Sequence, residues 1–365
     1  MIKEVIFLRS IACLAIVLGH SIASSLSWYP HITSEAWYIT DSWKMLMQLL
    51  LFGTPIFVFI SALVLSYSYP NGTPKHFLSK RLIFILIPYV IMGLGYAILA
   101  SLTQGSFNNL LGNMFDNVVL GQFHGYFIII IFQFYLLHIV FHKLVNYIRI
   151  ERLVIYSLII NVIYLQIAGV YLQDTRWGTQ LWWFPLCAWI FYYSLAYYLG
   201  RNLDKFRSAL NRHRWAIGIS CILTGALVLT LFHFNVLPSS GSKRIDVLLY
   251  TTFTCFFLFY IGSRMKKIPS VFVAISSYSF GIYWLHVFYI QVFHKVYKML
   301  AVDYQQLLNV SGYIIVLFIG STLLSIATVY LLHKFRFGAY VVGKIGAPYN
   351  KSQINHNSVE SLKAS

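Results

Sequence analysis

The chain has 365 residues, of which 59% are hydrophobic and only 10% are charged. So few charged residues could not cover the surface of a soluble protein of this length, which excludes that class. The formal net charge is +17, which could suggest a nucleic-acid partner. The basic residues lie mostly between long apolar stretches, however, so we expect them to report membrane topology and expect no nucleic acid to bind.

Apolar stretches of bilayer length recur along the whole chain. Each is about 17–25 residues long, which is what a helix needs to cross the hydrocarbon core. About ten such spans are predicted, at roughly 5–25, 43–67, 82–103, 125–142, 153–172, 183–200, 215–234, 247–263, 270–292 and 311–333. We therefore expect an all-α polytopic membrane protein, with one helical domain over 1–345 and a disordered cytoplasmic tail over 346–365.

The basic residues are divided unequally between the two sides of these spans. With the amino terminus placed inside, only six of the 27 lysines and arginines fall outside, namely Lys44, Arg176, Lys243, Arg244, Lys295 and Lys298. This division follows the positive-inside rule and predicts that both termini are cytoplasmic.

Two ionisable residues, Arg9 and His20, interrupt the first span, VIFLRSIACLAIVLGHSIASS. They are eleven positions apart, so in a helix they share one face and lie about 16 Å apart along the axis. Ionisable side chains are costly in hydrocarbon and usually face a protein interior or a wet cavity. Snorkelling or structural pairing is the alternative interpretation, and it explains Arg9 better than the deeper His20.

A second basic group precedes the third span. Lys80 and Arg81 stand in FLSKRLIFILIPY, and we expect them to join Arg9 at the cytoplasmic boundary. Arginine and lysine at this depth suit the phosphate groups of a ligand. The alternative is plain topology with lipid head-group contact, which we prefer for most other basic residues, such as Arg207 and Arg212.

Polar residues also gather near the outer ends of the fourth and ninth spans. The fourth begins with GQFHGYFIIIIFQF, which places Gln122, His124 and Tyr126 at its outer mouth. The ninth, SSYSFGIYWLHVFYI, carries His286 at about the depth of His20. We expect these five residues to form one polar cluster in the outer leaflet; the alternative for each is a hydrogen bond that holds two helices together.

The ninth span offers two further polar side chains, Ser279 and Tyr283, on the helical face that carries His286. No aspartate or glutamate lies deep in a predicted span, which removes the paired-carboxylate chemistry of glycosidases. Histidine is then the main buried group that can exchange a proton near neutral pH.

Four motifs occur in an order that resembles the membrane acyltransferase-3 superfamily, and the resemblance covers most of the chain. They are Arg9 and His20 in the first span, Phe57, Phe59 and Ser61 in the second, Lys80, Arg81, Pro88 and Tyr89 at the third, and Ser277, Tyr278, Tyr283 and His286 in the ninth.

This resemblance implies an enzyme of the bacterial plasma membrane that moves an acetyl or similar acyl group from cytoplasmic acyl-CoA to a hydroxyl of a cell-surface polysaccharide. It implies no permanently bound cofactor and no metal. The roles that follow are catalysis by His20 and His286, donor binding by Arg9, Lys80 and Arg81, and acceptor binding by Gln122, His124, Tyr126, Ser279 and Tyr283.

Two other functions stay open. The segments LGQFHGYFIIIIFQFYLL and RLIFILIPYVIMGLGY look closest to a branch of the family linked to poly-β-1,6-N-acetylglucosamine in biofilms, whose members are labelled exporters. A conduit would need an aromatic-lined path, which the 27 tyrosines and 29 phenylalanines could supply, but it would not need Arg9 aligned with His20. A scaffold for a polysaccharide synthase would leave the same pair unexplained.

Reporter fusions test the predicted topology. We expect fusions after Ser68 and Arg201 to report the cytoplasm and a fusion near Ser239 to report the outside, because the charge division places these loops on opposite sides. Paired reporters, each active on one side only, provide the measurement. An external carboxy terminus would contradict the assignment of depth on which the two predicted polar clusters depend.

Overall fold

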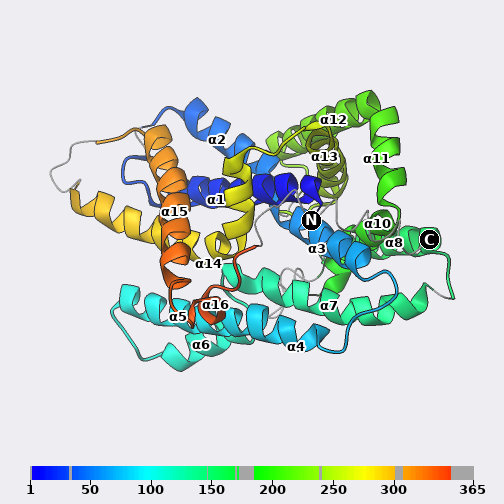
Figure 1. The fold of residues 1–365 in the computed structure, drawn as a ribbon. Coiled ribbons are helices and arrows are strands. Elements are labelled where there is room, and N and C mark those ends of the chain that lie inside the picture. The colour runs from blue at the N-terminus through cyan, green and yellow to red at the C-terminus, as the bar shows by residue number, and fades with distance from the viewer. Residues whose placement is uncertain are drawn as a thin grey trace.

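The computed structural model describes residues 2–32, 35–145, 147–168, 171, 185–237, 241–300 and 307–346, and in these ranges the regular structure is entirely helical (Figure 1). In chain order the elements are α1 (Lys3–Trp28), α2 (Trp37–Leu49), η2 (Leu50–Phe52), α3 (Gly53–Ser68), α4 (Phe77–Arg81), η3 (Leu82–Leu86), α5 (Ile87–Gln104), α6 (Leu110–Val118), η4 (His124–Tyr126), α7 (Phe127–Leu144), α8 (Ile150–Ile167), η6 (Leu186–Ala188), α10 (Ile190–Arg201), α11 (Leu203–Arg212), α12 (Arg214–His233), α13 (Ile245–Arg264), α14 (Ser270–Leu300), α15 (Val310–Leu332) and α16 (Gly338–Val341).

Nine helical stretches in the described ranges are long and apolar enough to cross a membrane, which confirms the all-α polytopic class. Three of them join shorter elements: Trp37–Ser68 contains α2, η2 and α3, Phe77–Gln104 contains α4, η3 and α5, and His124–Leu144 contains η4 and α7. The predicted tail 346–365 lies outside the described residues except for Gly346, whose N–H donates to the carbonyl of Ser277.

The sixth predicted span, 183–200, differs from the other nine. Its described part starts at Pro185 and contains α10, a helix of only 12 residues, which is shorter than a bilayer-spanning helix. This helix packs against α3 and α8 inside the bundle, and most of its side chains are buried. The first two residues of the predicted span lie outside the described ranges.

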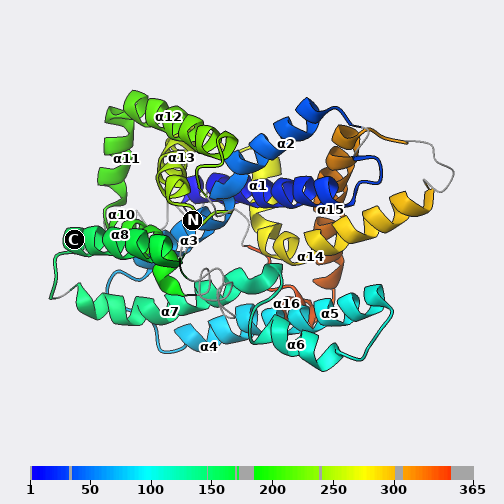
Figure 2. The ribbon, with the colours of Figure 1, turned by 180° about the vertical axis from the view of Figure 1, so that it is seen from behind.

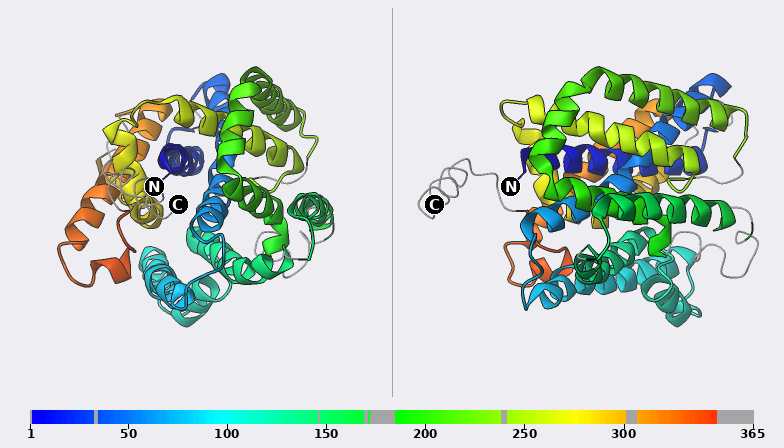
Figure 3. Two further views of the ribbon diagram at one scale, coloured as in Figure 1. Left: turned by 45° about the vertical axis from the view of Figure 1, so that its right-hand side comes forward. Right: turned by 90° about the vertical axis from the view of Figure 1, so that its right-hand side faces the viewer.

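Helix α1 lies inside a ring made by the other helices (Figure 3, left). It packs against α3, α13, α14 and α15, while α4 to α7 lie together along the opposite edge of the bundle (Figures 1 and 2). We call the side where α1 begins the N side and the side where it ends the far side. The enclosed position of α1 removes Arg9 and His20, the two ionisable residues that interrupt its apolar stretch, from lipid, as their cost in hydrocarbon requires.

Two buried carboxylates at opposite sides of the bundle each pair with an arginine. Glu4, at the start of α1, is 1% exposed and accepts hydrogen bonds of 2.8 and 3.0 Å from Arg207 of α11. Asp246, at the start of α13, pairs with the buried Arg244. The sequence suggested that Arg207 contacts lipid head groups, but in the structure it pairs with Glu4. Glu4 is too buried to be hydrated, so it needs this partner.

The pair Arg207–Glu4 should contribute measurably to stability. We expect Arg207→Met to lower the free energy of unfolding by about 2 kcal/mol, since it leaves a buried carboxylate unpaired; the value is reduced from that of a fully buried pair because Arg207 is partly exposed. Thermal unfolding of purified protein measures the change. The control is Arg212→Met on the same helix, an exposed residue that forms no ion pair with the described residues. Equal effects of the two variants would contradict the assignment.

Candidate active site

Three histidines from separate elements meet toward the far side of the bundle. The ring centroid of His286 on α14 lies 5.2 Å from that of His20 on α1 and 5.5 Å from that of His124 in η4. Three of the five residues that were expected to cluster are therefore ring neighbours. In the described part of the chain no group of three His, Cys, Asp or Glu side chains is arranged to share a metal ion.

The hydrogen bonds of His286 determine which of its ring nitrogens can act as an acceptor. Its Nδ1 lies 2.9 Å from the carbonyl oxygen of Ile282, and a carbonyl can only accept, so the neutral ring carries its proton on Nδ1. The Nε2 atom is then an acceptor. It is buried without a hydrogen-bond partner among the described residues, and so is Nε2 of His124. An unpaired buried nitrogen at such a place can form a hydrogen bond with a bound ligand.

His20 differs from His286 in its exposure. The side chain of His286 is 0% exposed. The side chain of His20 has accessible surface, although it lies in the interior of the helical bundle. A Cβ atom added to the neighbouring Gly19 would meet no atom within 4 Å, so open space lies beside this turn of α1. A ligand in that space would reach His20 first.

Two tyrosines belong to the same cluster. The hydroxyl of Tyr283 donates to the carbonyl of His124, and its ring lies 5.7 Å from the His124 ring. Tyr126 lies close enough to interact electrostatically with Tyr283. The predicted acceptor residues Tyr126, His124 and Tyr283 are thus neighbours in the structure.

Two other predicted acceptor residues are placed differently. The side chain of Gln122 is exposed and makes no hydrogen bond to the described residues. Ser279 is buried about 10 Å below His286 along α14, and its hydroxyl donates to the carbonyl of Ser276. Its own carbonyl lies 3.9 Å from Sγ of Cys13 on α1, midway between Arg9 and His20.

An aromatic shell that the sequence analysis did not identify surrounds the histidines. The Tyr96 ring lies 4.6 Å from His124, and Phe123 stacks on Trp284 at 6.3 Å. Trp284 is 0% exposed and also contacts Tyr89. With aromatic residues at 18% of the chain, no local signal distinguishes these positions from ordinary packing.

Gly125 allows this shell to close. A Cβ atom at this position would collide with the ring of Phe123 and lie 2.8 Å from the ring of Trp284. Only glycine therefore lets η4 approach α14 closely enough to place the preceding histidine.

A second cluster, toward the N side, contains two guanidinium groups. Tyr135 of α7 lies within electrostatic range of both Arg9 and Arg81. The Arg81 guanidinium lies 5.3 Å from the Tyr135 ring and 5.1 Å from the Phe77 ring, and its Nε is buried without a hydrogen-bond partner. In the described ranges neither arginine forms a salt bridge with a carboxylate, so the pair suits an anionic ligand. Lys80 is exposed and takes no part in these contacts.

Comparison of the sequence with known proteins identifies relatives of this chain. The family model of the acyltransferase domain matches residues 2–330. The chain is 34% identical over 362 residues to YfiQ of Bacillus subtilis (strain 168), named as a membrane-bound acyltransferase, with 96% of each chain covered. It is 28% identical over 305 residues to a Staphylococcus aureus (strain Mu50) protein named for export of poly-beta-1,6-N-acetyl-D-glucosamine, covering 78% of this chain and 81% of the other.

A Staphylococcus epidermidis protein with the same export name is 28% identical over 301 residues, covering 78% of this chain and 79% of the other. No solved structure matches the chain.

Proposed function

The chain belongs to the acyltransferase-3 family of multi-pass membrane proteins, and from that membership we propose that it transfers an acetyl or similar acyl group from cytoplasmic acyl-CoA to a hydroxyl of a cell-surface polysaccharide. One observation supports this reaction above all: a single enclosed helix, α1, carries one residue of the arginine cluster and one of the histidine cluster. Arg9 and His20 lie about 16 Å apart along it.

The donor lies with its phosphates at Arg9 and Arg81. Neither guanidinium has a carboxylate counter-ion in the described ranges, so phosphate oxygens can take both without breaking an existing salt bridge. Acyl-CoA carries its thioester at the end of a long flexible arm, which extends along α1 from the arginines toward the histidines. Donor and acceptor then meet inside the bundle, and the nucleotide part stays at the N side.

His20 acts as the general base. It takes the proton from the sugar hydroxyl while the hydroxyl oxygen attacks the thioester carbonyl. The carbon–sulfur bond then breaks, and the proton passes from the imidazolium to the departing thiolate. His286 and Tyr283 orient the acceptor, since Nε2 of His286 is an unsatisfied acceptor next to His20.

Export of a poly-N-acetylglucosamine polymer is the second candidate function, and the names of the staphylococcal relatives favour it. Export and acylation of one polymer are compatible in a single protein, but they make different demands on the side chains. Only acylation needs a base next to a site for a thioester. Composition of the surface glycan from cells with and without this protein separates the two functions.

Replacement of His20 tests the chemistry. We expect His20→Ala to lower acyl transfer by about 10²–10⁴-fold while the protein still inserts and unfolds at an unchanged temperature, because loss of a general base has effects of this size. Transfer of a radiolabelled acetyl group to polysaccharide measures it. His233→Ala, at the exposed end of α12, is the control and should retain activity. Normal transfer by His20→Ala would show that His20 is structural.

Replacement of Arg9 tests the donor site. A planar guanidinium can bind phosphate through two hydrogen bonds, which an ammonium cannot reproduce. We expect Arg9→Lys to weaken acyl-CoA binding by roughly tenfold and Arg9→Ala by roughly 100-fold, with a smaller change in the KM of the acceptor. Arg212→Ala, exposed on α11, should change neither constant. Calorimetric titration with acyl-CoA decides the point: equal affinity in wild type and Arg9→Ala would remove the donor role.

A further inference from the structure

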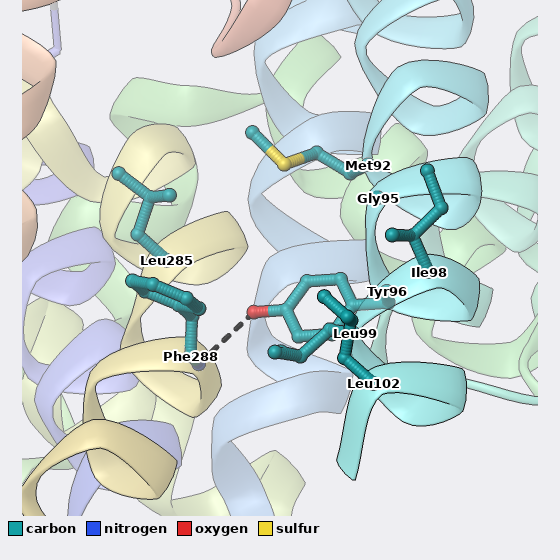
Figure 4. A pocket seen from close by; sticks show the side chains of 8 residues that line it. All are labelled: Met92, Gly95, Tyr96, Ile98, Leu99, Leu102, Leu285 and Phe288. Atoms are coloured by element: carbon teal, nitrogen blue, oxygen red, sulfur yellow. Dashed lines mark hydrogen bonds between the residues drawn. The ribbon is translucent and has the colours of Figure 1, made fainter. Parts of the chain in front are cut away.

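An apolar groove of about 320 Å³ lies between α5 and α14 (Figure 4). It runs from Met92 to Leu102 along α5, which is about 15 Å at the helical rise. Leu285 and Phe288 of α14 form the opposite wall. Both helices belong to membrane-spanning stretches, and Leu102 is 58% exposed, so the groove opens sideways toward the bilayer.

Among the side chains that line the groove only Tyr96 carries a hydroxyl, and this hydroxyl already makes two hydrogen bonds. It donates to the carbonyl of Trp284 at 2.8 Å. It also accepts from the N–H of Phe288 at 3.0 Å (Figure 4). The groove therefore offers a polar ligand little beyond one remaining lone pair of this hydroxyl. Its volume is at the lower end of ligand pockets, which suits one hydrocarbon chain.

Tyr96 belongs both to the groove and to the surroundings of the histidine cluster. One side of its ring lines the groove, and the ring centroid lies 4.6 Å from that of His124. Consecutive residues of α14 divide in the same way, since Leu285 faces the groove and His286 faces the other histidines. A chain held in the groove would thus place its head group within reach of the reacting site.

We propose that this groove holds the hydrocarbon chain of a lipid-linked sugar, so that the acyl acceptor reaches the histidines from the bilayer while still attached to its lipid. This inference rests on the proposed function, whose acceptor it specifies. An ordinary phospholipid would fill the same groove, but only a lipid that carries a sugar explains why the groove runs beside the histidines.

Gly95 provides a clean way to block the groove. It lines the groove, and a Cβ atom added there would meet nothing within 4 Å, so a larger side chain would fill the space without displacing the backbone. Replacement of a helical glycine also favours the helix. The matched control is Gly218→Leu on α12, where an added Cβ atom would meet the Phe257 ring at an ordinary 3.7 Å.

The test compares two acceptor probes in protein reconstituted into phospholipid vesicles: dodecyl and methyl N-acetyl-β-glucosaminide. We expect the wild type to acylate the dodecyl glycoside at least tenfold more efficiently in kcat/KM. Gly95→Leu should lose this advantage and retain its rate with the methyl glycoside, while Gly218→Leu behaves as the wild type. No preference for the dodecyl glycoside in the wild type, or equal losses with both probes in Gly95→Leu, would overturn the proposal.

A binding measurement keeps this inference separate from the proposed function. A dodecyl glycoside with a diazirine near the end of its chain should, on irradiation, label peptides of α5 and α14 that line the groove, and Gly95→Leu should abolish that labelling. Uniform labelling of lipid-facing helices such as α8 and α12 would overturn the groove assignment. If labelling follows the groove while the wild type acylates neither probe, the proposed reaction fails and the groove stands.

Discussion

Charge in hydrocarbon is the constraint that organises this molecule. An arginine and a histidine on the first helix cannot face lipid, so that helix has to lie inside a ring of others, as α1 does (Figure 3). The buried Glu4 meets the same requirement through its bonds to Arg207. Once α1 is enclosed, its two ends contribute to two separate polar clusters, and the helix itself joins them.

The two clusters differ in a way that matches their proposed tasks. Around Arg9 and Arg81 the positive charge has no carboxylate partner in the described ranges, which leaves it available to an anion. Around the histidines the described ring contacts are with other histidines and aromatic side chains, and the three rings lie within 5.2 to 5.5 Å of a neighbour. In the proposed reaction, charge recognises the donor at one end, and uncharged, proton-exchanging groups act at the other.

Sequence reasoning was sufficient for the class of fold and for the contacts that depend on helical spacing. The depth of His286 and the face of α1 follow from counting residues, and the structure brings His20 and His286 together. It could not tell that Arg81 joins the arginine cluster and Lys80 does not. The two residues are adjacent and point in different directions from one helix, and the sequence does not show which direction faces the bundle. It also missed Tyr96 and Trp284, since aromatic residues in an apolar helix carry no local sign of their partners. The prediction of a full span over 183–200 did not anticipate the short helix α10, because hydropathy does not report where a helix begins.

One hydroxyl from α5 sits within the backbone ladder of α14. The N–H of Phe288 and the carbonyl of Trp284 are the two groups that close a helical turn, and Tyr96 bonds to both. If that ring withdrew, the two groups could bond to each other, so the exchange would cost little hydrogen-bond energy. His286 lies within this turn. Of the three histidines it is therefore the one whose helical turn is bonded, on both sides, to a side chain of another helix.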